Sequence, residues 1–374
     1  MEHAMSSSMN PRTYIRPTVL LRTASQFPAS GRPIHIAGRA ELASVVVELI
    51  VGNSGERALR QMLSASELRT RAETDVAIAS RLERHEMPRA PLAGLVLDRP
   101  RLMGIVNVTP DSFSDGGAFG SARAAVDHAL RLEAEGADIL DIGGESTRPG
   151  AHPVTVDEEL ERVMPVIEGL AGKTKALISI DTRKAEVMRR ALAAGAHIIN
   201  DVAALTYEPA CLDVAASSDA PVILMHAQGD PRTMQAAPHY DDCLLDVCDW
   251  LEARIAACEA AGIARARLVI DPGIGFGKTL AHNLELLAGL TLLHGLGAPI
   301  LLGASRKSFI GTLTGIKDAR ARLPGSIAAA LQGAAQGVQI LRVHDVAETR
   351  QALTVWEAMG GSSPSPRETG RGSE

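Results

Sequence analysis

Short apolar runs alternate with longer amphipathic segments along the chain from about residue 101 onward. Each run places apolar side chains at successive positions, which is typical of a strand that is buried on both faces. Eight runs meet this description and predict strands: LMGIVNV, DILDIGG, ALISID, HIIND, PVILMH, RLVIDPG, PILLGAS and VQILRVH.

The segments between these runs have the spacing of helices with one apolar face. Examples are 121–135, 156–170, 184–194, 241–261, 280–293 and 325–335. Eight strands with helix-length connections predict an α/β fold, and eight βα units over about 260 residues match a (β/α)8 TIM barrel. The alternative is an open doubly wound sheet. That fold more often has a dinucleotide-type glycine turn after its first strand, where this chain has NVTPDSFSDGG.

Three regions follow from this pattern: an N-terminal extension over 1–100, the barrel over 101–358, and a tail over 359–374. In the extension, TVLLR and IHIAG predict strands, and 41–50 and 58–86 predict helices. Both a small α/β appendage and a partly ordered extension fit these residues. The tail is rich in Gly, Ser and Pro, so we expect it to be disordered.

Composition narrows the class of protein without identifying it. The chain has 374 residues, is 46% hydrophobic, and carries a net charge of −6 with both signs interspersed. We find no basic stripe suited to nucleic acid and no apolar run long enough to cross a membrane. The start of the chain lacks the pattern of a secretory signal, and the four cysteines form no C-x-x-C pair, so we expect a cytoplasmic protein with reduced thiols.

Polar residues end six of the predicted strands, where a barrel of this kind collects its catalytic groups. Carboxylates and carboxamides there suit a flat heterocycle with an amidine-like edge, because they accept or exchange N–H hydrogen bonds. Cations from the last two strands suit a phosphate group. These polar residues are Asn107, Asp181, Asn200, Asp271, Ser305 with Lys307, and Arg342 with His344. The alternative for Arg342 and His344 is a surface ion pair with Asp345.

Two other motifs are weaker than they first look. DPGIGFGKT ends like a phosphate-binding P-loop, but the first glycine of that pattern would fall on Pro272. His226 and His239 lie near acidic residues, but their spacing matches no metalloprotease or structural zinc pattern.

Long motifs in this order resemble one family, the dihydropteroate synthases of the folate pathway. GIVNVTPDSFSDGG and DILDIGGESTRPGA resemble its first two signatures, and SIDT, IINDV, LMHAQGDPRTMQ, DPGIGFGK, GASRKSFIG and LRVHDV follow in the family's order. The resemblance covers about residues 100–358 and leaves the extension unexplained.

The resemblance implies a (β/α)8 enzyme that joins 6-hydroxymethyl-7,8-dihydropterin diphosphate to 4-aminobenzoate, releases pyrophosphate and requires Mg2+. It also implies a homodimer. Residue by residue, Asp181, Asn200, Asp271 and Lys307 match the family's pterin contacts, and Asn107 matches its metal ligand. Arg342 and His344 match its diphosphate contacts, with Lys307, Arg342, His344 and Asp181 as the catalytic set. Further matches are Thr147, Arg148, Phe276 and Ser305 around the substrates, and Asp111, Phe113 and Ser114 in a loop that closes over them.

The implied chemistry agrees with the residue types. An arylamine is neutral at pH 7 and needs no strong base, so the main task is to stabilise the departing diphosphate. We therefore expect an SN1-like substitution. Two rival functions remain: a pterin-binding methyltransferase barrel with a corrinoid partner, and a silent barrel that acts as a binding partner. Neither needs the cations of SRK and RVH.

Overall fold

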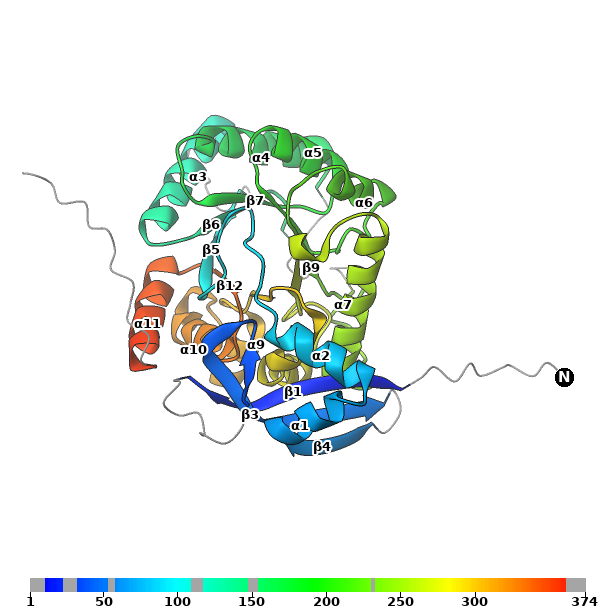
Figure 1. The fold of residues 1–374 in the computed structure, drawn as a ribbon. Helices are drawn as coiled ribbons and strands as arrows, with labels where there is room; N and C mark the ends of the chain where they lie inside the picture. Colours follow the sequence, from blue (N-terminus) through cyan, green and yellow to red (C-terminus); the bar gives the residue numbers. More distant parts are fainter. Residues whose placement is uncertain are drawn as a thin grey trace, which may run out of the picture.

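The computed structural model describes residues 11–22, 32–52, 58–108, 117–146, 154–229 and 233–360. At its centre is a sheet of eight parallel strands (Figure 1). These strands are β5 (Arg101–Asn107), β6 (Ile139–Gly143), β7 (Leu177–Asp181), β8 (Ile198–Asp201), β9 (Val222–Met225), β10 (Leu268–Asp271), β11 (Leu301–Leu302) and β12 (Ile340–Val343).

The sheet closes on itself. Its strands are ordered β10-β9-β8-β7-β6-β5-β12-β11. The two end strands meet where Ile270 bridges Ile300 in parallel, and the Ile270 N–H donates to the Pro299 carbonyl at 2.9 Å. The predicted TIM barrel is therefore confirmed, and the open doubly wound sheet is wrong.

Helices surround the ring of strands (Figure 1). The predicted helix over 156–170 coincides with α4, which begins at a capping box between Thr155 and Glu158. The predicted helix over 280–293 ends early, and a 3₁₀ helix, η3 (Leu290–Leu296), follows it. The helices are α3 (Gly117–Ala134), α4 (Val156–Leu170), α5 (Ala185–Ala193), α6 (Pro209–Ala216), α7 (Cys243–Ala260), α8 (Leu280–Ala288), α9 (Ser308–Thr314), α10 (Leu323–Ala335) and α11 (Val346–Met359).

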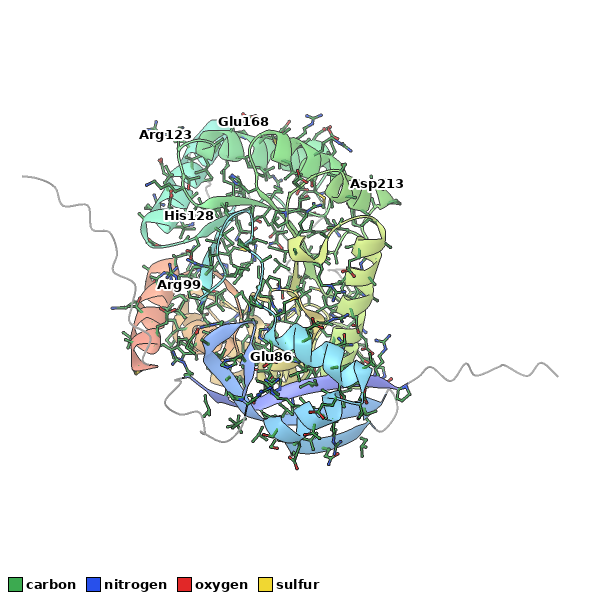
Figure 2. All side chains as sticks on the ribbon, in the orientation of Figure 1. Glu86, Arg99, Arg123, His128, Glu168 and Asp213 are labelled. Carbon is green, nitrogen blue, oxygen red and sulfur yellow. The ribbon has the colours of Figure 1, made fainter. Side chains whose placement is uncertain are left out.

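Alternate residues of each strand face the inside of the barrel, and side chains fill that space (Figure 2). The lowest inward layer is apolar and forms one cluster with Leu92 and Leu97 of the linker, the segment 87–100 that precedes β5. That layer contains Met103, Ile139, Ile198, Ile223, Val269, Leu301 and Ile340. Two residues further along five of the strands, the inward positions become polar: Asp141, Ser179, Asn200, Asp271 and Arg342. The linker thus closes the apolar end, and the polar layers face the other end.

The residues before the linker form an antiparallel sheet with two helices, drawn in blue to cyan along one side of the barrel (Figure 1). One face of this sheet packs on its helices, while Tyr14 and Ile50 belong to the main barrel cluster. The Tyr14 hydroxyl donates to Asp249 of α7 at 2.8 Å. The appendage contains β1 (Arg12–Leu21), β2 (Ile34–Ile36), β3 (Arg39–Gly52), β4 (Leu59–Ser64), α1 (Ala65–Ala72) and α2 (Val76–Glu86).

The helix predicted over 41–50 is wrong, because these residues lie within strand β3. Their Glu, Leu and Ala residues favour a helix in isolation, but the strand pairs with β1 along one edge and with β2 and β4 along the other. Pairing with distant segments overrides local propensity here. The predicted helix over 58–86 is correct only from Ala65 onward, because strand β4 precedes it.

Within the described parts of the chain, no helix combines the length and the apolar character that crossing a membrane requires.

Two fully buried histidines lie where the appendage meets the barrel. The ring centroids of His85, on α2, and His294, in η3, are 6.5 Å apart. Each ring has one nitrogen near a backbone carbonyl oxygen, that of Ile15 at 3.0 Å and that of Gln336 at 2.9 Å. Burial, helped by the positive charge of Arg89, lowers the pKa of His85 to about 3 and that of His294 well below its ordinary value.

We predict that these two histidines contribute a loss of stability as the pH falls below about 6.5, the ordinary histidine pKa. The unfolded chain then takes up protons that the folded chain excludes, which costs about 1.4 kcal/mol per pH unit and per histidine. Urea unfolding at several pH values measures this slope. The double variant His85→Gln, His294→Gln should have a shallower slope, and an unchanged slope would contradict the assignment.

Candidate functional site

The predicted polar residues gather at one end of the barrel, because parallel strands all finish at the same rim. Asn107, Asp181 and Asp271 are the last residues of β5, β7 and β10. Asn200 lies in β8, and Arg342 lies in β12. The chain after β11 contributes Ser305 and Lys307, and the chain after β12 contributes His344.

Arg342 lies at the centre of this group, held between two carboxylates. Its Nε donates to Asp141 Oδ2 at 2.6 Å, and its Nη2 donates to Asp181 Oδ2 at 2.7 Å. The Asn200 carboxamide donates to Asp141 as well, at 3.1 Å. Sequence reasoning missed Asp141. Its signal was a charged residue two positions after Ile139 in an otherwise apolar strand, where the inward face continues.

The alternative of an ion pair with Asp345 is wrong for Arg342 within the described residues. Asp345 instead pairs with Arg306, whose Nε lies 3.0 Å from Asp345 Oδ2. His344 contacts Ser305, with 3.0 Å between its Nδ1 and the serine Oγ. Ser305 and His344 therefore form one unit across the last two strands, beside the position of Arg342.

Lys307 follows β11, the strand next to β12, and contacts the loop after β10. Its ammonium donates to the Ile274 carbonyl and lies 4.4 Å from the centroid of the Phe276 ring. Burial lowers the pKa of Lys307 to about 8, although the nearby Asp271 carboxylate opposes this shift. Burial likewise raises the pKa of Asp271. The charge of each group opposes the pKa shift of the other, so the two charges influence each other near the mouth.

Asp181 is the carboxylate with the largest upward shift. Burial raises its pKa to about 7; the Asp141 charge adds to the shift, and Arg342 opposes it. A ligand that brings N–H donors to Asp181 would favour its ionised form, because hydrogen bonds to a carboxylate stabilise the charge.

The loop after β10 owes its shape to a glycine. Gly273 has φ +67°, and a Cβ there would lie 1.8 Å from the His226 carbonyl oxygen, so the loops after β9 and β10 touch backbone to backbone. Lys278 joins the same two loops: its Nζ lies 3.0 Å from both the Phe276 carbonyl oxygen and His226 Nδ1. The lysine of the apparent P-loop is thus buried, and it holds the loop that carries Phe276.

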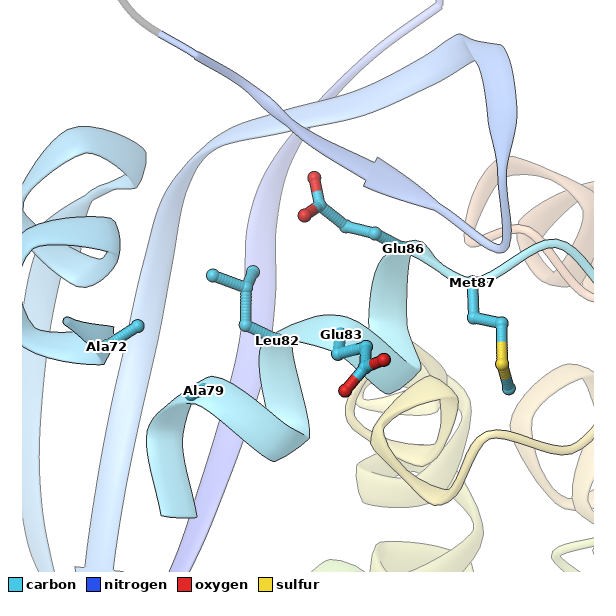
Figure 3. A pocket seen from close by; sticks show the side chains of 6 residues that line it. All are labelled: Ala72, Ala79, Leu82, Glu83, Glu86 and Met87. Atoms are coloured by element: carbon cyan, nitrogen blue, oxygen red, sulfur yellow. The ribbon is translucent and has the colours of Figure 1, made fainter. Parts of the chain in front are cut away.

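A cavity of about 300 Å³ opens beside these loops. Its walls come from the segments after β7, β8, β9 and β10, and they include Met225, Phe276 and Arg183, which stacks on Tyr207 at 4.2 Å. A larger hollow of about 490 Å³ lies on the appendage (Figure 3). It contains none of the predicted site residues, whereas Phe276 lines the cavity at the barrel mouth, so the mouth is the candidate site. The hollow is lined by Ala72, Ala79, Leu82, Glu83, Glu86 and Met87.

Five predicted residues lie outside the described part of the chain: Asp111, Phe113, Ser114, Thr147 and Arg148. Asn107 is described and half-buried, and its carboxamide makes no hydrogen bond to another described residue. The described residues contain no cluster of three His, Cys, Asp or Glu side chains suited to a metal. A single free carboxamide oxygen at a phosphate-binding rim fits Mg2+, which keeps several waters and takes few protein ligands.

Comparison with known proteins agrees with this geometry. A family model described as "Pterin binding enzyme" matches residues 103–344. The chain belongs to the pterin-binding enzyme family. Within the family it is similar to dihydropteroate synthase of Escherichia coli strain K12, with 53% identity over 264 residues, 71% of this chain and 93% of that protein. The corresponding protein of Neisseria meningitidis serogroup C is 54% identical over 267 residues, which cover 71% of this chain and 94% of that protein.

Solved structures of the family give the same result. A dihydropteroate synthase of Xanthomonas albilineans with 4-aminobenzoic acid is 57% identical, with a TM-score of 0.69, and the match covers 74% of this chain and 99% of that one. The same organism's enzyme in complex with 7,8-dihydropteroate has a TM-score of 0.67 at 54% identity, covering 74% of this chain and all of that one. The resemblance read from the sequence is therefore confirmed. The appendage lies outside the region that the family model matches.

We predict that Gly273→Ala is far more damaging than Gly172→Ala. Both glycines have positive φ, +67° and +72°, so alanine costs roughly 1–2 kcal/mol of backbone strain at either position. Only Gly273 adds the clash with the His226 carbonyl, because a Cβ at Gly172 would have no atom within 4 Å. Thermal unfolding of both variants measures the difference, and equal losses of stability would show that the two loops do not touch as described.

Proposed function

We propose that this chain catalyses the dihydropteroate synthase reaction. It condenses 6-hydroxymethyl-7,8-dihydropterin diphosphate with 4-aminobenzoate and releases 7,8-dihydropteroate and pyrophosphate. The names of the relatives, and the ligands in the two Xanthomonas structures, support this reaction. In the chain itself, the observation that best supports the reaction is a floor of buried Asp and Asn groups with the cations Arg342 and Lys307 beside it.

The floor suits the pterin ring. The 2-amino-4-oxo edge of a pterin presents N–H donors side by side, and Asp181, Asp271 and Asn200 offer acceptors from three strands. The Arg342 guanidinium has a similar N–C–N array of donors and already occupies Asp181. The ring would therefore take over the Asp181 acceptor, and the guanidinium would be freed to face the diphosphate. Phe276 and Met225 supply apolar walls.

Lys307, Arg342 and His344 would stabilise the charge that develops on the departing pyrophosphate. Asn107 would hold a Mg2+ ion, and bound Mg2+ would neutralise part of the same charge. Asp181 and Asp271 favour positive charge on the dihydropterin, which is consistent with an SN1-like substitution. Faster turnover of a pterin that bears an electron-withdrawing group would contradict a cationic transition state. The arylamine attacks as the neutral amine, so no general base is required of the chain.

Two expectations remain predictions that rest on the sequence: the homodimer and the cytoplasmic location.

A pyrophosphate-release assay tests the proposed function. We predict release only when the pterin diphosphate and 4-aminobenzoate are both present, and loss of release when EDTA removes Mg2+. Release without 4-aminobenzoate would indicate a hydrolase instead. No release under any of these conditions would refute the proposal.

The same assay on Lys307→Ala tests the site. We expect turnover to fall by about 100-fold or more, as when one preorganised donor to a developing anion is lost. Lys317→Ala is the matched control, because Lys317 is an exposed lysine on the same segment. Undiminished turnover of Lys307→Ala would remove Lys307 from the catalytic set.

A further inference from the structure

Among the described residues, Asp141 is an inward-facing carboxylate of the barrel that the proposed reaction does not use. It lies in the middle of β6, has no exposed surface, and faces inward one step below the rim. Arg342 Nε donates to its Oδ2 at 2.6 Å, and Asn200 Nδ2 lies 3.3 Å and 3.1 Å from its two oxygens. Asp141 therefore contacts Asn200 of the pterin floor and the Arg342 side chain, and it belongs to the same inward layer as both.

This contact decides which way the Asn200 carboxamide points. An ionised carboxylate only accepts hydrogen bonds, so the NH2 group of Asn200 must face Asp141 and its Oδ1 must face the mouth. Oδ1 accepts no hydrogen bond from another described residue, and it is not one of the described side-chain atoms that are both enclosed and unpaired. Asn200 consequently offers an acceptor to whatever binds above it. With Asp181 and Asp271 beside it, the floor offers acceptors only.

We propose that Asp141 is a positioning residue that sets the polarity of Asn200 and anchors Arg342, and thereby makes the site specific for heterocycles with a continuous N–H donor edge. The inference rests on the proposed function, because it assumes that the pterin is read by this floor. It extends that function, because it makes Asp141, a residue that does not touch the substrate, responsible for rejecting rings whose edge carries hydrogen-bond acceptors. The groups that face Asp141 are Arg342 from β12, Asn200 from β8 and Asp181 from β7.

The Asp141→Asn variant lacks the carboxylate that fixes the orientation of the Asn200 carboxamide. A carboxamide both donates and accepts, so the Asn200 side chain can then turn its NH2 group towards the donor edge of the substrate. Arg342 also loses an ionic acceptor. We expect the KM for the pterin diphosphate to rise by about 10-fold or more, the equivalent of one misdirected buried hydrogen bond. The KM for 4-aminobenzoate should change much less.

The swap Asp141→Asn, Asn200→Asp is the decisive variant. The carboxamide at position 141 then donates to position 200, and the carboxylate at position 200 still offers an acceptor to the substrate, so the polarity of the floor is restored. The net charge is also unchanged. We expect the swap to have a KM for the pterin diphosphate at least about 5-fold below that of Asp141→Asn, as for one recovered hydrogen bond. A role in packing alone predicts the opposite, namely that two changes are worse than one.

Asp138→Asn is the matched control. Asp138 lies immediately before β6, and its carboxylate also binds arginines, Arg101 and Arg350, but at the closed end of the barrel. This variant is expected to lower the melting temperature and to leave the KM for the pterin diphosphate within about 2-fold of wild type.

If Asp141→Asn does not fold, Asn200→Asp alone tests the inference. It places a second carboxylate where the amide now lies 3.1 Å from Asp141, so the two share one proton at low pH and repel each other when both are ionised. The KM of this variant for the pterin diphosphate should rise with pH more steeply than that of wild type. A parallel pH profile would overturn the inference.

These measurements distinguish a failure of the proposed function from a failure of the role proposed for Asp141. A wild-type enzyme without turnover refutes the proposed function. A wild-type enzyme with turnover, together with an Asp141→Asn variant whose KM stays within about 2-fold of it, refutes only the role of Asp141. A swap that binds the pterin diphosphate no better than Asp141→Asn also refutes it.

Discussion

The ion pairs of Arg342 with Asp141 and Asp181 are the interaction on which the rest of the site depends. Two carboxylates at such a short separation inside a protein would repel each other, and the guanidinium between them removes that repulsion. Loss of one partner of such a buried pair typically costs about 3–5 kcal/mol, because the remaining charge is left uncompensated. Arg342, Asp141 and Asp181 thus form a fixed charged platform. Asn200, Asp271 and Lys307 therefore have defined neighbours.

The apolar layer beneath this platform strengthens the electrostatic interactions within it. Met103, Ile139 and their counterparts on the other strands fill the barrel, and Leu92 and Leu97 of the linker pack against them, so that water reaches the charges only from the mouth. Electrostatic interactions are stronger in such surroundings than in water. The shifted pKa values of Asp181 and Lys307 follow from the same burial. The change from an apolar inward layer to polar inward positions nearer the mouth therefore determines both the stability of the barrel and the chemistry of its mouth.

The barrel could be predicted from the sequence because buried parallel strands leave continuous apolar runs, and because polar residues at their ends stand out against them. Asp141 does not stand out in the same way, because it lies in the middle of β6, two residues before the strand ends. The strand over 41–50 was read as a helix, because its partners β1, β2 and β4 are set by long-range pairing that local propensity does not contain. The contact of Gly273 with the His226 carbonyl is equally non-local.

The most direct test of the account is a crystal structure of the chain with 6-hydroxymethyl-7,8-dihydropterin diphosphate and Mg2+, without 4-aminobenzoate. We expect the N–H edge of the pterin to lie on Asp181, Asp271 and the Asn200 Oδ1 atom. We also expect that the Arg342 guanidinium has left Asp181 for the diphosphate while its Nε stays on Asp141. A pterin bound elsewhere, with Arg342 still on Asp181, would contradict the central claim.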